Sequence, residues 1–162
     1  MKRSRRDFTF FWSGPFSQWA MYPIEIDGVI YNCNEQYMMA EKARLFGDEE
    51  ILERIMNASD PSTQKSLGRM VRGFDKDVWE ANCREIVYRA NLAKFTQHEM
   101  LKSRLFSTGK TIIVEASKYD TVWGIGMTDS HPDVCNPTKW KGTNWLGEAI
   151  MRVRDEMFKL KS

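Results

Sequence analysis

One helix-forming segment, Asn34–Gly47, constrains this chain most, because it places charged side chains where a packed helix needs apolar ones. Glu35 and Lys42 are about seven residues apart, roughly two helical turns, so they project from the same side. The same side carries the segment's larger apolar residues, which are Met38, Met39, Leu45 and Phe46. An acid and an amine inside an apolar stripe oppose stability, and conflicts of this kind are expected at functional sites.

Two interpretations of the Glu35 and Lys42 pair stay open at this point. The pair could be a partly exposed ion pair at the edge of a core helix. Alternatively it could form a pocket wall with a general acid or base and a desolvated amine. Burial lowers the pKa of a lysine, and such an amine can act as a nucleophile on the anomeric carbon of a sugar.

The remaining pattern predicts a mainly helical α+β domain with a small β-sheet. A length of 162 residues favours one domain, and we expect a basic N-terminal arm at 1–7 followed by this domain at 8–162. Strands are expected at 8–12 and 111–116, with a hairpin at 24–31 that turns at Asp27-Gly28. Helices are expected at 34–46, 48–58 and 61–71, from 75 or 77, at 97–106 and from 144.

Composition excludes several classes of function. The three cysteines and two histidines form no spacing typical of zinc, so we expect neither metal nor cofactor. The odd, widely spaced cysteines favour a reducing cytoplasmic compartment, and no apolar run is long enough for a membrane span. A net charge of +2 gives only a weak nucleic-acid signal. The basic residues at the start form either a solvated tail or a phosphate-contacting arm, and they are Lys2, Arg3, Arg5 and Arg6.

Two further segments carry candidate ligand-binding residues. Lys65 and Arg69 are four residues apart on an expected helix, and like charges at this spacing repel. They indicate either a solvated cationic face or a site for phosphate, which arginine binds in bidentate fashion. In the loop after the last strand, Asp120 is a candidate catalytic carboxylate. Trp123 could stack on a ring, and Gly124 could allow close backbone approach, although an ordinary loop with a core tryptophan also fits.

Weaker candidates lie near two predicted turns. Ser17 and Gln18 offer small polar groups beside aromatic residues, in either a binding surface or a packed edge. Asn144 precedes the last helix, where it could be the N-cap or could extend its amide into a pocket.

These segments, taken in order, resemble the NADAR family, which includes the YbiA/RibX-like proteins. The resemblance covers about residues 8–157. It rests on the order of many short motifs: Phe16-Ser17-Gln18-Trp19, Glu35 through Ala43, Lys65 through Arg69, Gly73-Phe74-Asp75, Trp79, Lys94-Phe95, Thr108-Gly109, Glu115-Ala116-Ser117, Asp120, Trp123 through Gly126, and Gly142 through Gly147.

The resemblance implies a compact, largely helical α+β fold and an N-glycosidase. Family members are described as removing ADP-ribose from guanine bases in nucleic acid, some as antitoxins to DNA ADP-ribosyltransferases. Others hydrolyse early phosphorylated riboflavin intermediates. The expected substrate is therefore ADP-ribosylated nucleic acid, or alternatively a ribosylated small molecule, and a toxin is a possible functional partner. A non-catalytic ADP-ribose or NAD-binding module and a host-interaction protein are the alternatives from other classes.

The hypothesis assigns separate roles to the candidate residues. Lys42 forms a Schiff base with ring-opened ribose, partly as the resemblance implies, and Glu35 is the general acid or base. Asp120 assists proton transfer or holds the ribose. The expected substrate-binding residues are Arg69 and Lys65 for phosphates, Trp123 for a ring, and Gly124, Ser17, Gln18 and Asn144.

Overall fold

The chain forms two units, one of which is inserted into the sequence of the other. The computed structural model describes residues 3–161. The first unit combines the N-terminal residues through Ser17 with the chain from His98 onward, and the second is the continuous segment Gln18–Gln97. The α+β class with helix predominating is confirmed, but the small sheet consists of two separate strand pairs.

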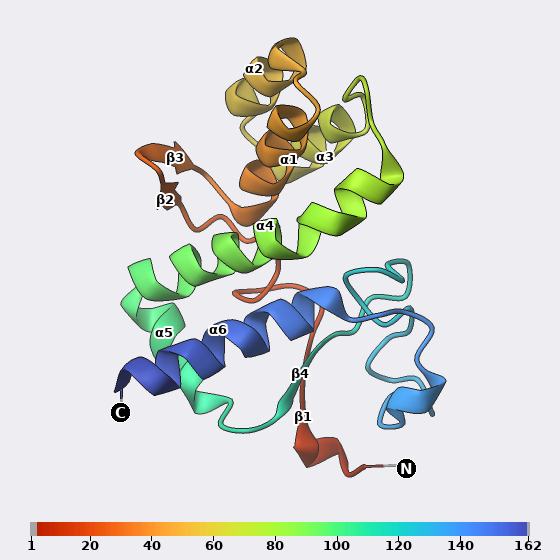
Figure 1. The fold of residues 1–162 in the computed structure, drawn as a ribbon. Helices are drawn as coiled ribbons and strands as arrows, with labels where there is room; N and C mark the ends of the chain where they lie inside the picture. The colour runs from red at the N-terminus through yellow and green to blue at the C-terminus, as the bar shows by residue number, and fades with distance from the viewer. Residues whose placement is uncertain (1–2, 162) are drawn as a thin grey trace. The chain divides into compact units, whose positions relative to one another are not determined.

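A parallel strand pair organises the first unit (Figure 1). A short 3-10 helix, η1 (Arg5–Asp7), leads into β1 (Phe8–Phe11), and β1 pairs with β4 (Ile112–Glu115) in the register Phe8 to Ile112. Helix α5 (Glu99–Ser107) precedes β4, and η2 (Pro137–Lys139) lies in the loop after it. Helix α6 (Trp145–Lys161) packs on β4. It does so through an apolar face whose buried residues are Leu146, Ala149, Ile150, Val153 and Met157.

The second unit begins with the predicted hairpin. Strands β2 (Ile24–Ile26) and β3 (Val29–Tyr31) pair in antiparallel fashion. The two turn residues have positive φ, 53° at Asp27 and 81° at Gly28. A two-residue turn of the favoured hairpin type needs positive φ at both positions, which aspartate tolerates and glycine adopts freely.

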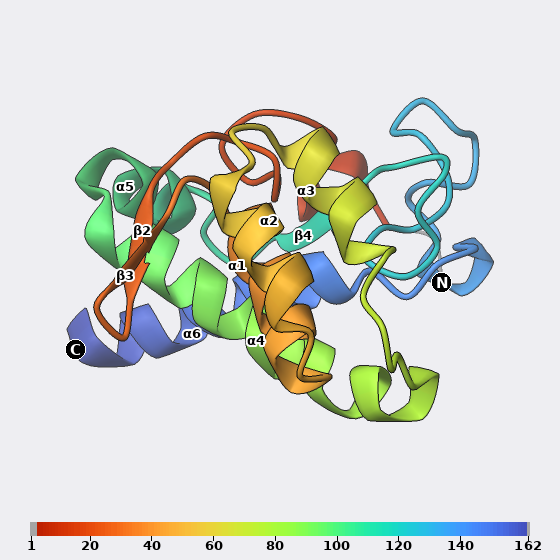
Figure 2. The same cartoon turned by 90° about the horizontal axis from the view of Figure 1, so that it is seen from above.

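Four helices complete the second unit (Figure 2). They are α1 (Asn34–Leu45), α2 (Glu49–Asn57), α3 (Pro61–Gly68) and α4 (Lys76–Gln97). Helix α1 packs against the other three, so it is the central element of this unit. The predicted N-caps are confirmed, because Asp48 accepts a hydrogen bond from the Ile51 amide at 3.2 Å and Asp60 accepts one from Thr63 at 2.9 Å. Helix α3 ends at Gly68, earlier than predicted.

Candidate functional site

The N-terminal half of α1 is buried on all sides rather than along one stripe. Every residue of 34–40 is buried, although the expected stripe residues Leu45 and Phe46 are only half-buried. The one-sided stripe was therefore wrong, because α2, α3 and α4 cover several faces of α1. Glu35, with 4% of its surface exposed, lies in this buried half, and half-buried Lys42 follows where the helix approaches solvent.

Trp19 holds Glu35 in place. Its indole Nε1 donates a hydrogen bond to Glu35 Oε1 at 3.1 Å, and the Glu35 amide donates to the Gln18 carbonyl at 3.0 Å. The position of Glu35 is thus fixed by hydrogen bonds to both its side chain and its backbone. Trp19 itself is 42% exposed, so its ring connects the buried acid to the surface.

Aromatic rings surround the Lys42 amine. Its Nζ lies 4.7 Å from the centre of the Phe74 ring and 5.7 Å from that of Trp79. Burial lowers the pKa of Lys42, the negative charge of Glu35 partly offsets this, and the positive charge of Arg69 lowers it again. Because the ammonium form is the one disfavoured, a larger share of Lys42 is neutral and nucleophilic near neutral pH than for an ordinary lysine.

Two cations of α3 lie beside this pair. The Nζ of Lys65 is 5.9 Å from the centre of the Trp19 ring, and Arg69, the C-cap of α3, is close enough to influence Lys42. Both side chains are exposed. We name Trp19, Glu35, Lys42, Lys65 and Arg69 the Lys42 cluster. It combines an acid, a destabilised ammonium, exposed positive charge and an exposed ring within one unit.

Asp120 organises a loop of the first unit. Its Oδ1 accepts backbone hydrogen bonds from Val122 at 2.9 Å and Trp123 at 2.7 Å, with Gly124 at 3.5 Å. This oxygen therefore closes the turn that follows β4. The catalytic role of Asp120 stays a prediction, and any such role falls to its other oxygen.

Replacing Asp120 separates these two roles. We expect Asp120→Ala to lower the free energy of unfolding by about 1–2 kcal/mol, because it leaves backbone N–H groups without their acceptor. Asp120→Asn keeps an acceptor oxygen and should retain most of that stability, as urea unfolding would show. Wild-type turnover by Asp120→Asn would contradict a catalytic role.

Gly124 and Asn144 serve the first unit itself. A Cβ at Gly124 would lie 2.7 Å from Glu115 Oε2 and 2.9 Å from the Glu115 carbonyl oxygen, so the close approach is to the protein's own chain. The Asn144 amide donates to the Ile113 carbonyl at 3.0 Å and its Oδ1 accepts from the Glu115 amide at 3.0 Å. Asn144 is 1% exposed. Its side chain therefore anchors α6 to β4, and the substrate-binding roles of Gly124 and Asn144 stay predictions.

Trp123 and Ser17 also belong to the first unit. The half-buried Trp123 packs edge-on against Trp145, with ring centres 5.9 Å apart. The Ser17 amide donates to the Gly14 carbonyl at 2.9 Å. The structure gives both residues packing or turn contacts, and their binding of substrate stays a prediction.

Gln18 belongs to a buried amide network that the sequence did not reveal. Its Oε1 accepts from the side-chain amides of Asn34 at 3.3 Å and Asn91 at 3.2 Å. Asn34 also donates to Asn91 at 3.0 Å. The available signal was Asn91, a polar residue that lies among the apolar residues of the helical segment. Gln18 therefore supports the start of α1 from inside, and its binding of substrate stays a prediction.

Lys94 belongs to one of the family motifs, but no sequence pattern indicated a role for it. It is fully buried on α4, 5.7 Å from the centre of the Tyr22 ring. Burial lowers the pKa of Lys94 to about 7, from an ordinary value of 10.5. Its charge therefore opposes the folded state at acidic pH.

Stability should depend on pH through Lys94. Between pH 7 and 10.5 the unfolded chain binds the proton that the folded chain has lost, so the free energy of unfolding should rise with pH across this window. Lys94→Met should remove up to about 1.4 kcal/mol per pH unit of this slope. Urea unfolding at pH 7, 8 and 9 measures it, with Lys76→Met on the exposed start of α4 as the control. Parallel curves for wild type and Lys94→Met would contradict the assignment.

The basic N-terminal segment is not a free tail in the part that the structure describes. The Arg3 amide donates to the Cys135 carbonyl at 3.0 Å, and Arg5 donates to the Asp129 carbonyl at 2.7 Å and pairs with its carboxylate at 3.5 Å. Lys2 lies outside the described residues. The expected arm therefore has one of its charges neutralised, while the side chains of Arg3 and Arg6 remain exposed.

Two features are absent from residues 3–161, a cluster of metal ligands and a membrane-spanning helix. These residues contain no group of three or more histidine, cysteine, aspartate or glutamate residues arranged to hold a metal ion. Within the same residues, no helix combines the length and apolar character that crossing a membrane requires.

Comparison with known proteins places the chain among named N-glycosidases. It is 40% identical over 148 residues to N-glycosidase R617 of Acanthamoeba polyphaga mimivirus, covering 87% of this chain and 86% of that protein. Protein irg-1 of Caenorhabditis elegans is 38% identical over 130 residues, which are 79% of this chain but only 61% of that protein.

Escherichia coli YbiA agrees in both sequence and structure. N-glycosidase YbiA is 32% identical over 144 residues, 89% of this chain and 81% of that protein. The NMR structure of YbiA superposes with a TM-score of 0.80 at 29% identity, covering 99% of this chain and 90% of that one. The sequence model of the NADAR domain matches residues 7–158. The chain therefore belongs to the NADAR family.

Proposed function

We propose that this chain is an N-glycosidase that removes ADP-ribose from guanine bases in nucleic acid. The observation that carries the proposal is the pairing of buried Glu35 with Lys42, an amine of lowered pKa, on one helix. The names of the mimivirus and E. coli relatives support cleavage of an N-glycosidic bond. The nucleic-acid substrate is the finer part of the proposal.

The proposed reaction uses the amine and the acid in sequence. In the reactive form of the pair the proton is on Glu35 and Lys42 is neutral. Lys42 then attacks the anomeric carbon as the bond from this carbon to the base nitrogen breaks. The bonding electron pair leaves with the base, which takes a proton from Glu35. The resulting sugar–lysine adduct loses an N–H proton to Glu35, and the ring opens with protonation of its oxygen to give a Schiff base. Water then adds to this carbon and releases the free sugar and the amine.

The other members of the Lys42 cluster have binding roles in this scheme. Arg69 and Lys65 bind the phosphates, for which exposed cations on α3 are suited. The exposed ring of Trp19 contacts the leaving base, while its N–H fixes the acid that protonates that base. Asp120 and Trp123 of the first unit keep their predicted roles as proposals, to be tested by substitution.

Trp19→Phe isolates the positioning of Glu35. Phenylalanine retains an aromatic surface but removes the N–H that donates to Glu35 Oε1. We expect kcat to fall about tenfold with little change in KM, because loss of one hydrogen bond to a charged group is worth roughly 1.5–3 kcal/mol. Steady-state kinetics separate the effects on kcat and KM. Trp19→Leu is measured alongside, and it should also raise KM. Unchanged kcat in Trp19→Phe would contradict the positioning role.

A direct assay distinguishes the substrates. The protein is incubated with DNA carrying ADP-ribosylated guanine and, separately, with a ribosylamino-pyrimidine phosphate, and released sugar is measured. Release from the modified DNA that is lost in Lys42→Met supports the proposal. Release from neither substrate, combined with tight ADP-ribose binding, would instead indicate a binding module.

One observation favours the small-molecule alternative. Because Arg5 is paired with Asp129, the N-terminal segment offers less positive charge to a nucleic-acid backbone than its sequence suggested. A nucleic-acid substrate should make activity fall steeply with added salt, and the slope should weaken in Arg3→Gln/Arg6→Gln. This double variant is preferable to deleting the segment, which would also remove the Arg5 contacts. Activity independent of salt would favour the riboflavin-type intermediate.

A further inference from the structure

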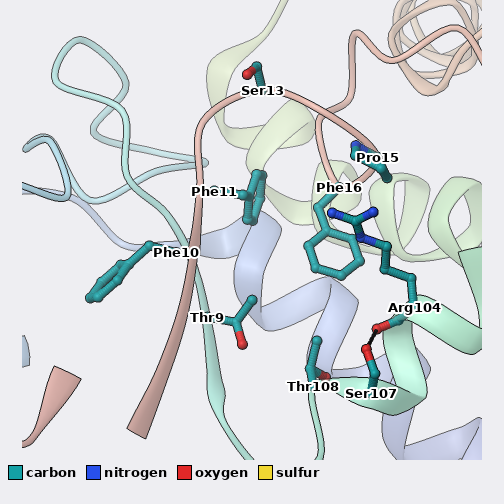
Figure 3. Close-up of a pocket in the computed structure, with 9 residues that line it drawn as sticks. All are labelled: Thr9, Phe10, Phe11, Ser13, Pro15, Phe16, Arg104, Ser107 and Thr108. Atoms are coloured by element: carbon teal, nitrogen blue, oxygen red, sulfur yellow. Dashed lines mark hydrogen bonds between the residues drawn. The ribbon is translucent and has the colours of Figure 1, made fainter. Parts of the chain in front are cut away.

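A cavity of about 340 Å³ lies within the first unit. In the view of Figure 3 the Phe16 ring lies between Phe11 and the side chain of Arg104, and Ser107 and Thr108 lie below them at the end of α5. The Phe10 ring points away from these residues in the same view. None of these residues belongs to the Lys42 cluster, so the cavity needs its own explanation.

The aromatic wall of the cavity suits a planar ring. Phe11 and Phe16 pack edge to face, with ring centres 5.7 Å apart and planes at 78°. Phe16 is buried, at 7% exposure, whereas Phe11 remains half-buried. A fixed pair of rings with one partly open surface allows a third ring to pack against it.

Two arginines make this end of α5 positive. Arg104 is exposed and lines the cavity. Arg154 is 5% exposed and donates to Thr108 Oγ1 at 2.9 Å, while its Nε has no hydrogen-bond partner among residues 3–161. Burial lowers the pKa of Arg154, and the negative charge of the neighbouring Asp155 partly offsets this. Arginine guanidinium groups bind phosphate or carboxylate, so the cavity favours an anionic group near Arg104.

Two of the hydroxyl groups that line the cavity, those of Thr9 and Ser107, already donate their protons to other residues. Ser107 Oγ donates its proton to the Arg104 carbonyl at 2.7 Å. Thr111 donates to the Thr108 carbonyl at 2.9 Å, so Thr9 is the donor in its 2.7 Å contact with Thr111. A hydroxyl has one proton and two lone pairs. Thr9 and Ser107 therefore present acceptor oxygens, which select a ligand that carries N–H or O–H donors.

We propose that this cavity binds a nucleoside monophosphate whose planar base carries an exocyclic amino group. The base packs against Phe11, its amino group donates to the hydroxyl oxygens, and its phosphate pairs with Arg104. The volume is near the lower end of the roughly 300–1,000 Å³ typical of ligand cavities, which suits one base with one phosphate. The site involves no bond cleavage and does not depend on the proposed glycosidase activity.

Amide chemical-shift titrations of ¹⁵N-labelled protein test this site with three probes. Adenosine monophosphate should shift the amides of Thr9, Phe11, Ser107 and Thr108 and saturate. Purine riboside monophosphate, which lacks the amino group, should bind at least about fivefold more weakly, and inorganic phosphate about tenfold more weakly. Equal affinity for all three would overturn the proposal.

Substitution of Arg104 gives the decisive comparison. Arg104→Gln should weaken adenosine monophosphate binding about tenfold or more, whereas Lys102→Gln, which removes the same charge from α5 outside the cavity, should leave it within about twofold. Both side chains lie outside the core, so both variants should fold. Equal binding by wild type and Arg104→Gln would overturn the assignment.

A 5′-phosphorylated (dA)₆ strand identifies the source of the nucleotide. Binding of this strand that requires Arg104 would show that the site accepts a strand end, and binding of only the free nucleotide would show that it does not. Both results support a nucleotide site. Strand binding that does not require Arg104, without binding of the free nucleotide, would overturn it.

Discussion

Lys42→Met is expected to abolish turnover of an N-glycosidic substrate, lowering kcat/KM by roughly 10³-fold or more. Methionine keeps an unbranched stem against Phe74 and Trp79 but has no amine to attack the anomeric carbon. Borohydride reduction during turnover should attach the sugar covalently to wild type, which intact-mass spectrometry detects. The adduct should be absent from Lys42→Met.

Lys65→Met is the matched control for this experiment. Lys65 also places its Nζ near an aromatic ring of the same cluster, 5.9 Å from the centre of Trp19, but its side chain is exposed. We expect Lys65→Met to raise KM and still form the borohydride adduct. Equal trapping by wild type and Lys42→Met, or turnover by both without any trapping, would remove the amine from the mechanism.

Glu35→Gln is expected to lower kcat by about 10²–10⁴-fold, the range that general acid or base catalysis supplies. The glutamine oxygen can still accept the hydrogen bond from Trp19, so the geometry of α1 is retained while the proton donor is lost. Steady-state kinetics of wild type and Glu35→Gln measure the loss. The matched control is Glu41→Gln on the same helix, which should stay within a few-fold of wild type.

The same variant reports on Lys42. Because the charge of Glu35 raises the pKa of Lys42, its removal should lower that pKa further. The part of the pH–rate profile that reflects deprotonation of Lys42 should therefore move to lower pH in Glu35→Gln. A profile that stays in place would show that the two groups are not electrostatically coupled during turnover.

Local rules predicted much of this fold. The Asp27-Gly28 turn and the caps at Asp48 and Asp60 depend on backbone angles and nearby amides, which the sequence encodes within four residues. The burial of α1 on all sides was not predictable in this way. Periodicity describes one face of one helix, whereas three other helices cover α1, and Gln36 is accommodated inside by donating to the Ile55 carbonyl at 3.1 Å.

In the candidate site, too, local features could be predicted from the sequence, whereas contacts between distant segments could not. Conflict between charge and burial identified Glu35 and Lys42 because both lie in one segment. The aromatic rings around Lys42 were not predicted. Phe74 and Trp79 come from a different part of the chain, and no local pattern indicates that they approach Lys42. Asp120, Gly124 and Asn144 have structural contacts that the sequence did not indicate, since each of them contacts the backbone of its own unit. Their roles toward a substrate stay predictions.

The pairing of β1 with β4 has a consequence for synthesis. Residues 8–11 join residues 112–115, so a chain emerging from the ribosome cannot complete this pair until about a hundred further residues have followed, and non-local pairing is slow to form. The continuous second unit is complete earlier and can acquire its structure first. During that interval β1 is an unpaired, phenylalanine-rich strand, which makes the nascent chain most prone to aggregate before β4 arrives.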